Sequence, residues 1–382
     1  MRYARRLAGA LLIAGAASCG WGQTTNPAPH QPHRQRIVSP EVHADRTVTF
    51  RFRDPNAQDV MLALSGAQPV LMQKNARGVW SATAGPLDPN IYGYSFIADH
   101  VGLIDPSNSM IAPNLLGPDS LVLVPGSSPM PWEITDAPHG VVHHIFYHSG
   151  VVGDNRDYYV YTPPGYNPRA KRKYPVLYLL HGFSDDASAW TAVGRANIIL
   201  DNLIDEKKVQ PVVVVMPLGY GAPAIVSRTG PGFSSANLRE ENMTKFRDSL
   251  LTEIIPRVED EFRVKTDRKD RAITGLSMGG AESLFVGLNN LDRFAWVGSF
   301  SAGGLGADYN DEFPSLTSKA NGQLRLLWIA CGTDDHLIGP NRKFRAWLTS
   351  KGIRHTNIET PGMHTWMVWR NNLVHFAPLL FR

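Results

Sequence analysis

Cysteine is scarce in this sequence. The 382 residues include two, Cys19 and Cys331, and the first falls within an N-terminal targeting pattern. We therefore expect no disulfide, and the fold must be stabilised by packing. Charged residues are also few, at 19%, whereas hydrophobic residues make up 43%. This composition excludes a disordered chain and predicts a globular protein with a large core.

A hydrophobic run long enough to span a bilayer is also missing. The apolar run 7–17 is too short for that, and three arginines precede it, which is typical of a signal peptide cleaved after Gly22. We therefore expect residues 1–22 to be a signal peptide and the protein to be secreted or periplasmic. Ala16-Ala17-Ser18-Cys19 leaves open a second interpretation, a lipoprotein anchored at Cys19.

The sequence after residue 22 contains no long run of basic residues and no glycine pattern typical of dinucleotide binding. Loss of the signal peptide removes three arginines and no acid, which brings the formal net charge of +4 close to neutral. Without a basic run to neutralise successive phosphates, neither nucleic acid nor an anionic membrane is an expected partner. No internal repeat and no Rossmann pattern appears, so the sequence gives no sign of a nucleotide cofactor.

The first part of the chain is predicted to be all β. Residues 23–36 are rich in Pro, Gln, Asn and His and predict a flexible leader. Residues 37–126 carry short β-type runs between turn signals, which predicts a small immunoglobulin-like sandwich. Tyr92, Tyr94 and Phe96 alternate; they could stack on sugar rings, but inward-facing core is favoured. The expected strands are 47–53, 60–64, 79–83, 92–98 and 120–124.

The second part of the chain is predicted to be α/β. Proline, glycine and serine are dense at 125–131, which marks a domain boundary. Residues 131–382 then alternate strand-like and helix-like segments, the pattern of a parallel sheet covered by helices. A turn at Gly153-Asp154-Asn155 would join the first two strands. Strands are expected near 140–147, 158–161, 176–180, 212–216, 296–300, 324–330 and 356–359, and helices near 198–206, 240–262 and 341–351.

A nucleophile elbow of the form G-x-S-x-G lies at 275–279, with Ser277 at its centre. Such an elbow places a serine on a sharp turn from strand to helix, where glycines two positions away relieve steric crowding. Residues 271–274 lean towards β structure and 281–287 have helical composition, so the motif has the context that it requires. Ser277 is therefore the predicted nucleophile.

The partners of Ser277 follow from the chain order of an α/β-hydrolase triad, which is serine, acid, histidine. Among the later histidines, His355 leads into a strand and His375 lies in a helical segment. His364 remains, in a turn-forming loop after the last predicted strand. The acid should follow the preceding strand, where Asp334 and Asp335 are adjacent. Either could orient the imidazole, and spacing alone does not choose between them.

Two backbone donors are needed for the oxyanion that forms when a serine attacks an ester. The residue after the nucleophile, Met278, supplies one of them. The strand at 176–180 ends in His181-Gly182-Phe183, where the glycine lets the chain turn and present the Phe183 amide. These pieces, in the required order, predict a serine hydrolase.

The motifs resemble the esterase-D-like group of α/β-hydrolases, which includes bacterial feruloyl and acetylxylan esterases, enterochelin esterases and mycolyltransferases. The preceding domain is similar to the early-set, glycogen-binding-like sandwich of many xylan-directed members. The resemblance implies that Asp335 is the triad acid and that Trp190 and Trp366 flank the acyl or sugar site, with simple packing as the alternative for each tryptophan. It runs from about residue 139 to the C-terminus and is carried by Leu179-Leu180-His181-Gly182, Thr274-Gly275-Leu276-Ser277-Met278-Gly279-Gly280, Cys331-Gly332-Thr333-Asp334-Asp335 and Gly362-Met363-His364-Thr365-Trp366.

The expected function is a secreted serine carboxylesterase that removes feruloyl or acetyl groups from xylan or its fragments, without cofactor or metal. Tyr220, in the loop 219–238, is a further aromatic residue expected near Ser277. A neutral aromatic surface suits a sugar ring or a hydroxycinnamoyl group. If the two domains are independent, a fragment beginning near Pro131 should keep its activity on small esters.

Three alternatives stay open. An acyltransferase would use the same triad, and a siderophore esterase would need basic side chains such as Arg228 and Arg239 against its anionic ligand. A catalytically silent carbohydrate-binding protein is the third. A metal site is not expected at the histidine-rich stretch, because the neighbours His143 and His144 would face opposite sides of a strand. The oligomeric state is not predicted.

Overall fold

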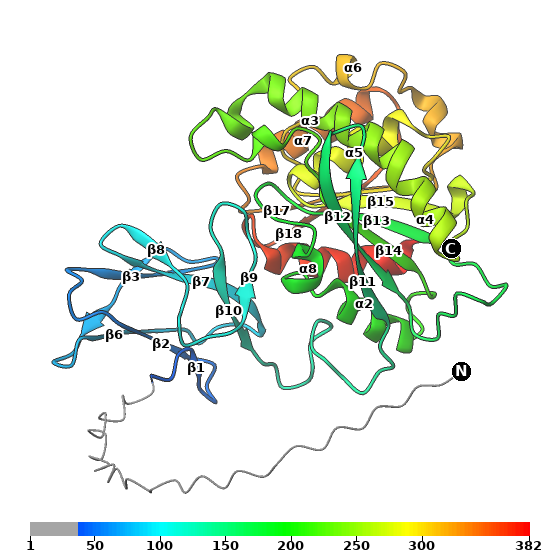
Figure 1. The fold of residues 1–382 in the computed structure, drawn as a ribbon. Helices are drawn as coiled ribbons and strands as arrows, with labels where there is room; N and C mark the ends of the chain where they lie inside the picture. The colour runs from blue at the N-terminus through cyan, green and yellow to red at the C-terminus, as the bar shows by residue number, and fades with distance from the viewer. Residues whose placement is uncertain (1–36) are drawn as a thin grey trace, which may run out of the picture. The chain divides into compact units, whose positions relative to one another are not determined.

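The structure, a computed structural model, describes residues 37–382. The predicted signal peptide, the leader and Cys19 lie outside the described residues. Among these residues, no helix combines the length and apolar character that crossing a membrane requires. A β-sandwich region comes first in the chain, and a mixed sheet with helices follows it (Figure 1), which confirms the predicted fold class.

Two sheets form the sandwich, with strand orders β1-β2-β6-β5 and β4-β3-β7-β10-β9, and β8 pairs with β7. Buried and partly exposed residues alternate along β2 and β3, as a half-buried strand requires. The ring centroids of Phe50 and Tyr94 are 4.7 Å apart in its core. Tyr92, Tyr94 and Phe96 are buried core residues, so they form no platform for sugars. The strands are β1 Glu41–Val42, β2 Val48–Arg53, β3 Val60–Leu64, β4 Val70–Leu71, β5 Gln73–Lys74, β6 Val79–Ala84, β7 Asn90–Ala98, β8 Val101–Leu103, β9 Ile111–Ala112 and β10 Asp119–Val124. The short strands β1, β4, β5, β8 and β9 were not predicted, because two or three residues carry no recognisable alternation.

The second sheet has eight strands in the order β11-β12-β14-β13-β15-β16-β17-β18. β11 and β12 form an antiparallel hairpin, β14 pairs antiparallel with β12, and the remaining neighbours are parallel. All five residues of β13 are buried, since helices cover both faces of the sheet. The strands are β11 Val141–Ser149, β12 Asp154–Thr162, β13 Val176–Leu180, β14 Val213–Pro217, β15 Arg271–Gly275, β16 Trp296–Phe300, β17 Leu326–Gly332 and β18 Thr356–Thr360.

Two layers of helices enclose this sheet (Figure 1). Apolar residues of α3, α4, α5 and α7 pack on one face, and those of α1, α2 and α8 pack on the other. The helices are α1 Ala189–Ala192, α2 Ala196–Asp205, α3 Ala236–Ser249, α4 Ile255–Glu261, α5 Met278–Asn289, α6 Tyr309–Glu312, α7 Ile338–Ser350 and α8 Trp366–Phe376, with a π-helical segment, η3 Leu250–Ile254. Short 3₁₀ segments are η1 Pro223–Ile225, η2 Gly232–Ser234, η4 Arg268–Asp270, η5 Ser318–Gly322 and η6 Ala377–Leu379.

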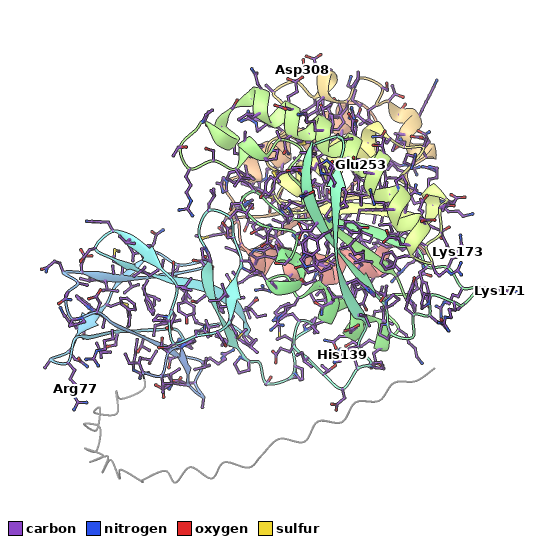
Figure 2. All side chains as sticks on the ribbon, in the orientation of Figure 1. Arg77, His139, Lys171, Lys173, Glu253 and Asp308 are labelled. Carbon is purple, nitrogen blue, oxygen red and sulfur yellow. The ribbon has the colours of Figure 1, made fainter. Side chains whose placement is uncertain are left out.

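The helix predicted at 240–262 is not one regular helix. It begins at Ala236 and widens into η3 just before Pro256, whose ring cannot follow a regular turn because it clashes with an earlier carbonyl. Glu253 lies in this widened turn (Figure 2), and its carboxylate accepts hydrogen bonds from the N–H groups of Gly150 and Val151. The hairpin therefore turns at 150–153, and Asp154 opens β12 instead of lying in the predicted turn.

Candidate active site

Ser277 lies between β15 and α5 in a backbone conformation that strains a residue with a side chain. Its φ is 51° and its ψ is −116°. A Cβ atom at Gly275 would overlap the backbone of Gly279, and a Cβ at Gly279 would overlap the carbonyl oxygen of His181. Both glycines of the elbow are thus required by the close approach of backbone segments, which exposes the Ser277 side chain at the end of the sheet.

A chain of hydrogen bonds joins Ser277 to an acid. The Nε2 atom of His364 is 2.9 Å from Ser277 Oγ, and its Nδ1 atom is 2.8 Å from Oδ2 of Asp335. The Asp335 side chain is 0% exposed and its other oxygen accepts the Leu337 N–H at 2.8 Å. Burial alone would raise the pKa of Asp335, but the hydrogen bonds from His364 and Leu337 outweigh it and hold the pKa below its ordinary value.

The neighbouring acid points elsewhere. Asp334 is exposed, and its Oδ2 accepts the N–H of Gly362 and the hydroxyl of Thr333, both at 3.1 Å. It therefore ties the loop after β17 to the loop after β18 from outside. The geometry brings Asp335, and not Asp334, to His364.

The predicted oxyanion donors flank the same serine. Met278 is the first residue of α5, so its N–H has no partner within the helix. Phe183 lies in the 181–185 loop that follows β13, and a Cβ built at Gly182 would be 3.4 Å from the Cβ of Ser277. The loop thus passes directly beside Ser277.

His181 holds the base of the 181–185 loop. Its Nε2 accepts the N–H of Gly219 at 2.8 Å, and its Nδ1 is 2.8 Å from the Gly182 carbonyl oxygen, which assigns the proton to Nδ1. Burial lowers the pKa of His181 to about 4, so this imidazole is neutral at ordinary pH. It joins two loops and carries no charge to the site.

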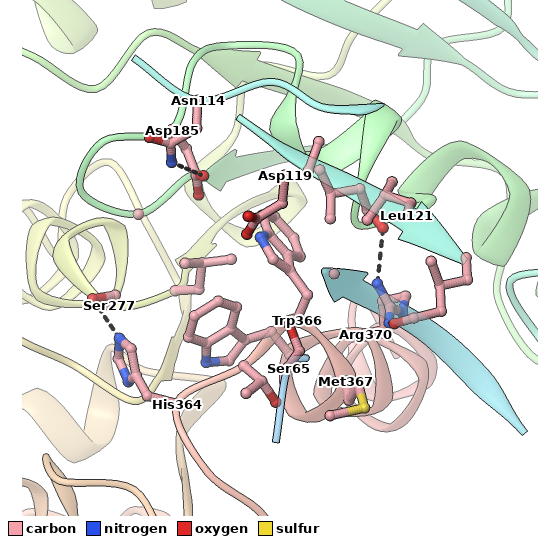
Figure 3. Close-up of a pocket in the computed structure, with 18 of the residues that line it drawn as sticks. Ser65, Asn114, Asp119, Leu121, Asp185, Ser277, His364, Trp366, Met367 and Arg370 are labelled. Carbon is pink, nitrogen blue, oxygen red and sulfur yellow. Dashed lines mark hydrogen bonds between the residues drawn. The ribbon is translucent and has the colours of Figure 1, made fainter. Parts of the chain in front are cut away.

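A cavity of about 250 Å³ opens beside Ser277 and His364 (Figure 3). One wall, which includes Phe183 and Trp366, comes from the part of the chain that holds the mixed sheet and the triad candidates, residues 131–382, called the catalytic region. The opposite wall comes from the sandwich region, from β7, β9, β10 and the loops beside them. The sandwich residues of this wall are Ser65, Ile91, Gly93, Ala112, Pro113, Asn114, Gly117, Asp119 and Leu121. Sequence reasoning missed this wall, because no motif in the first 130 residues indicates a functional site.

Two of the aromatic residues predicted to contact substrate, Trp190 and Tyr220, are buried away from the cavity at Ser277. Trp190 is 1% exposed, donates its indole N–H to the Leu180 carbonyl and packs edge-on against Trp366. Tyr220 is 3% exposed and donates its hydroxyl to the Asp185 carbonyl at 2.7 Å. Neither lines the cavity at Ser277, whereas Trp366 does. Trp190, from α1, and Tyr220, from the loop after β14, therefore pack against the segments around Ser277 instead of lining its cavity.

The cavity is lined by acids more than by cations. Asp119 and Asp185 both face it, and burial raises the pKa of Asp119 and brings that of Asp185 to about 7. Among the described residues that line it, Arg370 alone is an arginine or lysine, and it is 0% exposed. Its guanidinium donates to the carbonyl oxygens of Val193 and Ile91.

The arginines considered for an anionic ligand lie elsewhere. Arg228 donates to the Leu116 carbonyl, Arg239 donates to the Phe233 carbonyl, and neither lines the cavity at Ser277. The strand histidines also separate: His143 bonds to Thr162 and His144 to Asp157.

A sequence model of the Esterase family, described as "Putative esterase", matches residues 149–380. The chain is 29% identical over 354 residues to the endo-1,4-beta-xylanase/feruloyl esterase of Xylanibacter ruminicola, which covers 90% of this chain and 46% of that protein. It is 23% identical over 233 residues to the acetyl esterase of Caldicellulosiruptor saccharolyticus, covering 52% of this chain and 80% of that protein. The chain thus spans about half the length of the first of these relatives.

Solved structures share the fold. The ferulic acid esterase of Anaeromyces mucronatus superposes with a TM-score of 0.57 at 24% identity, covering 66% of this chain and 96% of that chain. The enterobactin esterase of Shigella flexneri has a TM-score of 0.66 at 18% identity and covers 87% of this chain and 92% of that chain. At these identities the likeness concerns architecture alone.

Proposed function

The chain belongs to the Esterase family, and from this we propose that it is a serine carboxylic ester hydrolase. One observation carries the proposal: Ser277 Oγ, the His364 imidazole and the Asp335 carboxylate are joined by hydrogen bonds of 2.9 and 2.8 Å. Such a chain activates a hydroxyl that is otherwise a weak nucleophile.

In the proposed reaction, Ser277 Oγ attacks the ester carbonyl while His364 Nε2 takes the hydroxyl proton. The oxyanion accepts hydrogen bonds from the Phe183 and Met278 amides. Collapse of this intermediate breaks the bond to the leaving alcohol, which receives the proton from His364. Water then attacks the acyl-enzyme by the same route and releases the acid. Asp335 keeps the proton of His364 on Nδ1 and stabilises the imidazolium.

We propose that the substrate is a feruloyl or acetyl ester on xylan or a xylan fragment. We also propose that the protein is secreted or periplasmic. The N-terminal pattern and the names of two relatives, a xylanase/feruloyl esterase and an acetyl esterase, support this. The exposed part of Trp366 offers an aromatic wall beside Ser277. Asp119 offers a carboxylate of the kind that binds sugar hydroxyls.

The cavity favours a neutral substrate over a siderophore. A catecholate ligand is anionic, and burying its charge would be unfavourable because none of the described residues that line the cavity offers a free arginine or lysine side chain. The Arg370 guanidinium donates to the backbone carbonyl oxygens of Val193 and Ile91, so it is not free to bind an anionic ligand. We therefore expect kcat/KM to be higher for acylated xylan fragments than for a trilactone siderophore.

Two measurements test the proposal. The Ser277→Ala variant should lose at least about 10⁴-fold in kcat on p-nitrophenyl acetate, and a sulfonyl fluoride should add mass to the wild-type enzyme but not to this variant. kcat/KM on methyl ferulate, acetylated xylo-oligosaccharide and a catecholate trilactone then ranks the substrates. Unchanged turnover in Ser277→Ala would refute the hydrolase, and a preference for the trilactone would refute the substrate.

A further inference from the structure

The loop of the sandwich between β9 and β10, residues 113–118, contacts the 181–185 loop through three hydrogen bonds. The Leu115 N–H donates to the Ser184 carbonyl at 2.7 Å. The Asn114 Nδ2 group donates to Ser184 Oγ at 2.9 Å and to Asp185 Oδ1 at 3.3 Å. Figure 3 shows Asn114 reaching Asp185 at the edge of the cavity. The sandwich thus binds the two residues that directly follow Phe183.

Ser184 needs such support. Its φ is 68°, in the left-handed region that a residue with a Cβ rarely adopts and that costs about 1 kcal/mol or more. Its neighbour Phe183 presents the amide proposed to bind the oxyanion. Fixing Ser184 anchors the chain directly after Phe183 and so limits how far the peptide unit that carries this amide can move. The catalytic region holds the same loop from the other side, through Tyr220 on the Asp185 carbonyl.

We propose that Asn114 is a positioning residue for catalysis: the sandwich fixes the 181–185 loop so that the Phe183 amide points at the developing oxyanion. This inference rests on the proposed hydrolase function. A misdirected donor weakens an interaction that exists only in the transition state, so kcat falls while KM changes little. Removal of one oxyanion donor costs about 10²–10³-fold, and a loosened donor should cost about tenfold or more.

Asn114 also shapes its own loop, and a substitution can separate this local role from the proposed contact with the 181–185 loop. Its Oδ1 accepts the N–H groups of Leu116 and Gly117, which shapes the sandwich loop itself. Asn114→Asp keeps this acceptor, removes the Nδ2 donor to Ser184 and Asp185, and places a carboxylate oxygen against the Asp185 carboxylate, which further loosens the contact. Ser184→Ala removes the hydroxyl acceptor from the other partner and leaves the sandwich loop intact.

A matched control exists in the same region. Asn75, in the turn between β5 and β6, accepts the N–H groups of Arg77 and Val79 with its Oδ1 in the same manner. It does not line the cavity at Ser277. Asn75→Asp therefore repeats the chemical change of Asn114→Asp without touching the 181–185 loop.

The experiment compares kcat and KM on p-nitrophenyl acetate for the wild type, Asn114→Asp, Ser184→Ala, the double variant and Asn75→Asp, with thermal unfolding as the check on folding. We expect both single variants at the site to lose about tenfold or more in kcat at nearly constant KM. The double variant should lose little more than Asn114→Asp, because the Asn114–Ser184 bond that Ser184→Ala breaks is already lost in Asn114→Asp. Asn75→Asp should match the wild type.

The outcomes separate the two proposals. If the wild type is active and both Asn114→Asp and Ser184→Ala keep kcat within about twofold, or if their effect is on KM alone, the positioning role is refuted and the hydrolase stands. If Asn114→Asp does not fold, Ser184→Ala decides the question, since it leaves the sandwich loop unchanged. An inactive wild type would refute the hydrolase and the positioning role together.

Discussion

Replacing each of the two adjacent acids by asparagine tests the geometry of the site most directly. Oδ1 of Asp335 accepts the Leu337 N–H and Oδ2 faces Nδ1 of His364. In Asp335→Asn, the amide oxygen can keep the Leu337 bond only if the NH₂ group faces His364. The imidazole must then accept at Nδ1 and carry its proton on Nε2, the tautomer that cannot take the Ser277 proton.

The expected loss in kcat follows from this forced tautomer. The same substitution in a serine protease triad costs about 10⁴ in kcat, which corresponds to about 5.5 kcal/mol of transition-state stabilisation. The Asp335 side chain is 0% exposed, so water cannot replace the lost acceptor and we expect the full effect. Asp334→Asn is the matched control: the exposed side chain keeps an oxygen for the Gly362 N–H, and kcat should stay within about threefold of wild type.

The assay is steady-state hydrolysis of p-nitrophenyl acetate at about pH 7.5, which is above the ordinary pKa of histidine. Circular dichroism should show that both variants fold. A larger loss in Asp334→Asn than in Asp335→Asn would refute the assignment of the triad acid and the geometric reasoning behind it.

Two further predictions concern the acids in the cavity. Burial raises the pKa of Asp185 to about 7 from 3.8, so the unfolded chain releases this proton before the folded chain does, and stability is lost as pH rises through that interval. The stability of Asp185→Asn relative to the wild type, measured by urea unfolding, should therefore rise by about 3 kcal/mol between pH 4.5 and 8; a difference in stability that does not vary with pH would contradict this. Asp119→Asn should lower kcat/KM about tenfold more for acetylated xylo-oligosaccharide than for p-nitrophenyl acetate, because hydrogen bonds from hydroxyls to a carboxylate contribute about 1.5–3 kcal/mol. An equal loss on both substrates would show that the carboxylate does not contact the sugar.

The parts of the site that the sequence predicts are those set by local backbone geometry. The elbow at Ser277 needs small residues at fixed positions, and the loops carrying the acid and His364 follow strands whose apolar runs are visible in the sequence. The choice between Asp334 and Asp335 is different in kind. Adjacent residues in a turn point in different directions, and only the packed loops decide which one is buried.

Aromatic residues gave the least reliable predictions. Trp190 and Trp366 are both large and apolar, and both lie at the start of a helix. Nothing in the local sequence therefore distinguishes the residue that lines the cavity from the one that packs behind it. In the structure Trp366 is partly exposed whereas Trp190 packs beneath it. Burial of this kind depends on neighbours that are distant in the sequence.

The role of the sandwich also depends on distant contacts, and the fragment beginning near Pro131 now has a different expected outcome. Without the sandwich, the buried guanidinium of Arg370 would lose the Asn90 and Ile91 oxygens that it binds, and the 181–185 loop would lose Asn114 and Leu115. Ile91 and Leu121 of the sandwich belong to the same apolar cluster as Trp190 and Val368, so the fragment would expose part of this cluster to water and should be less stable than the full chain in urea unfolding. Where it folds, kcat on p-nitrophenyl acetate should fall by about the same factor as in Asn114→Asp, since the same support is missing. A fragment with wild-type stability and wild-type kcat would show instead that the two regions are independent.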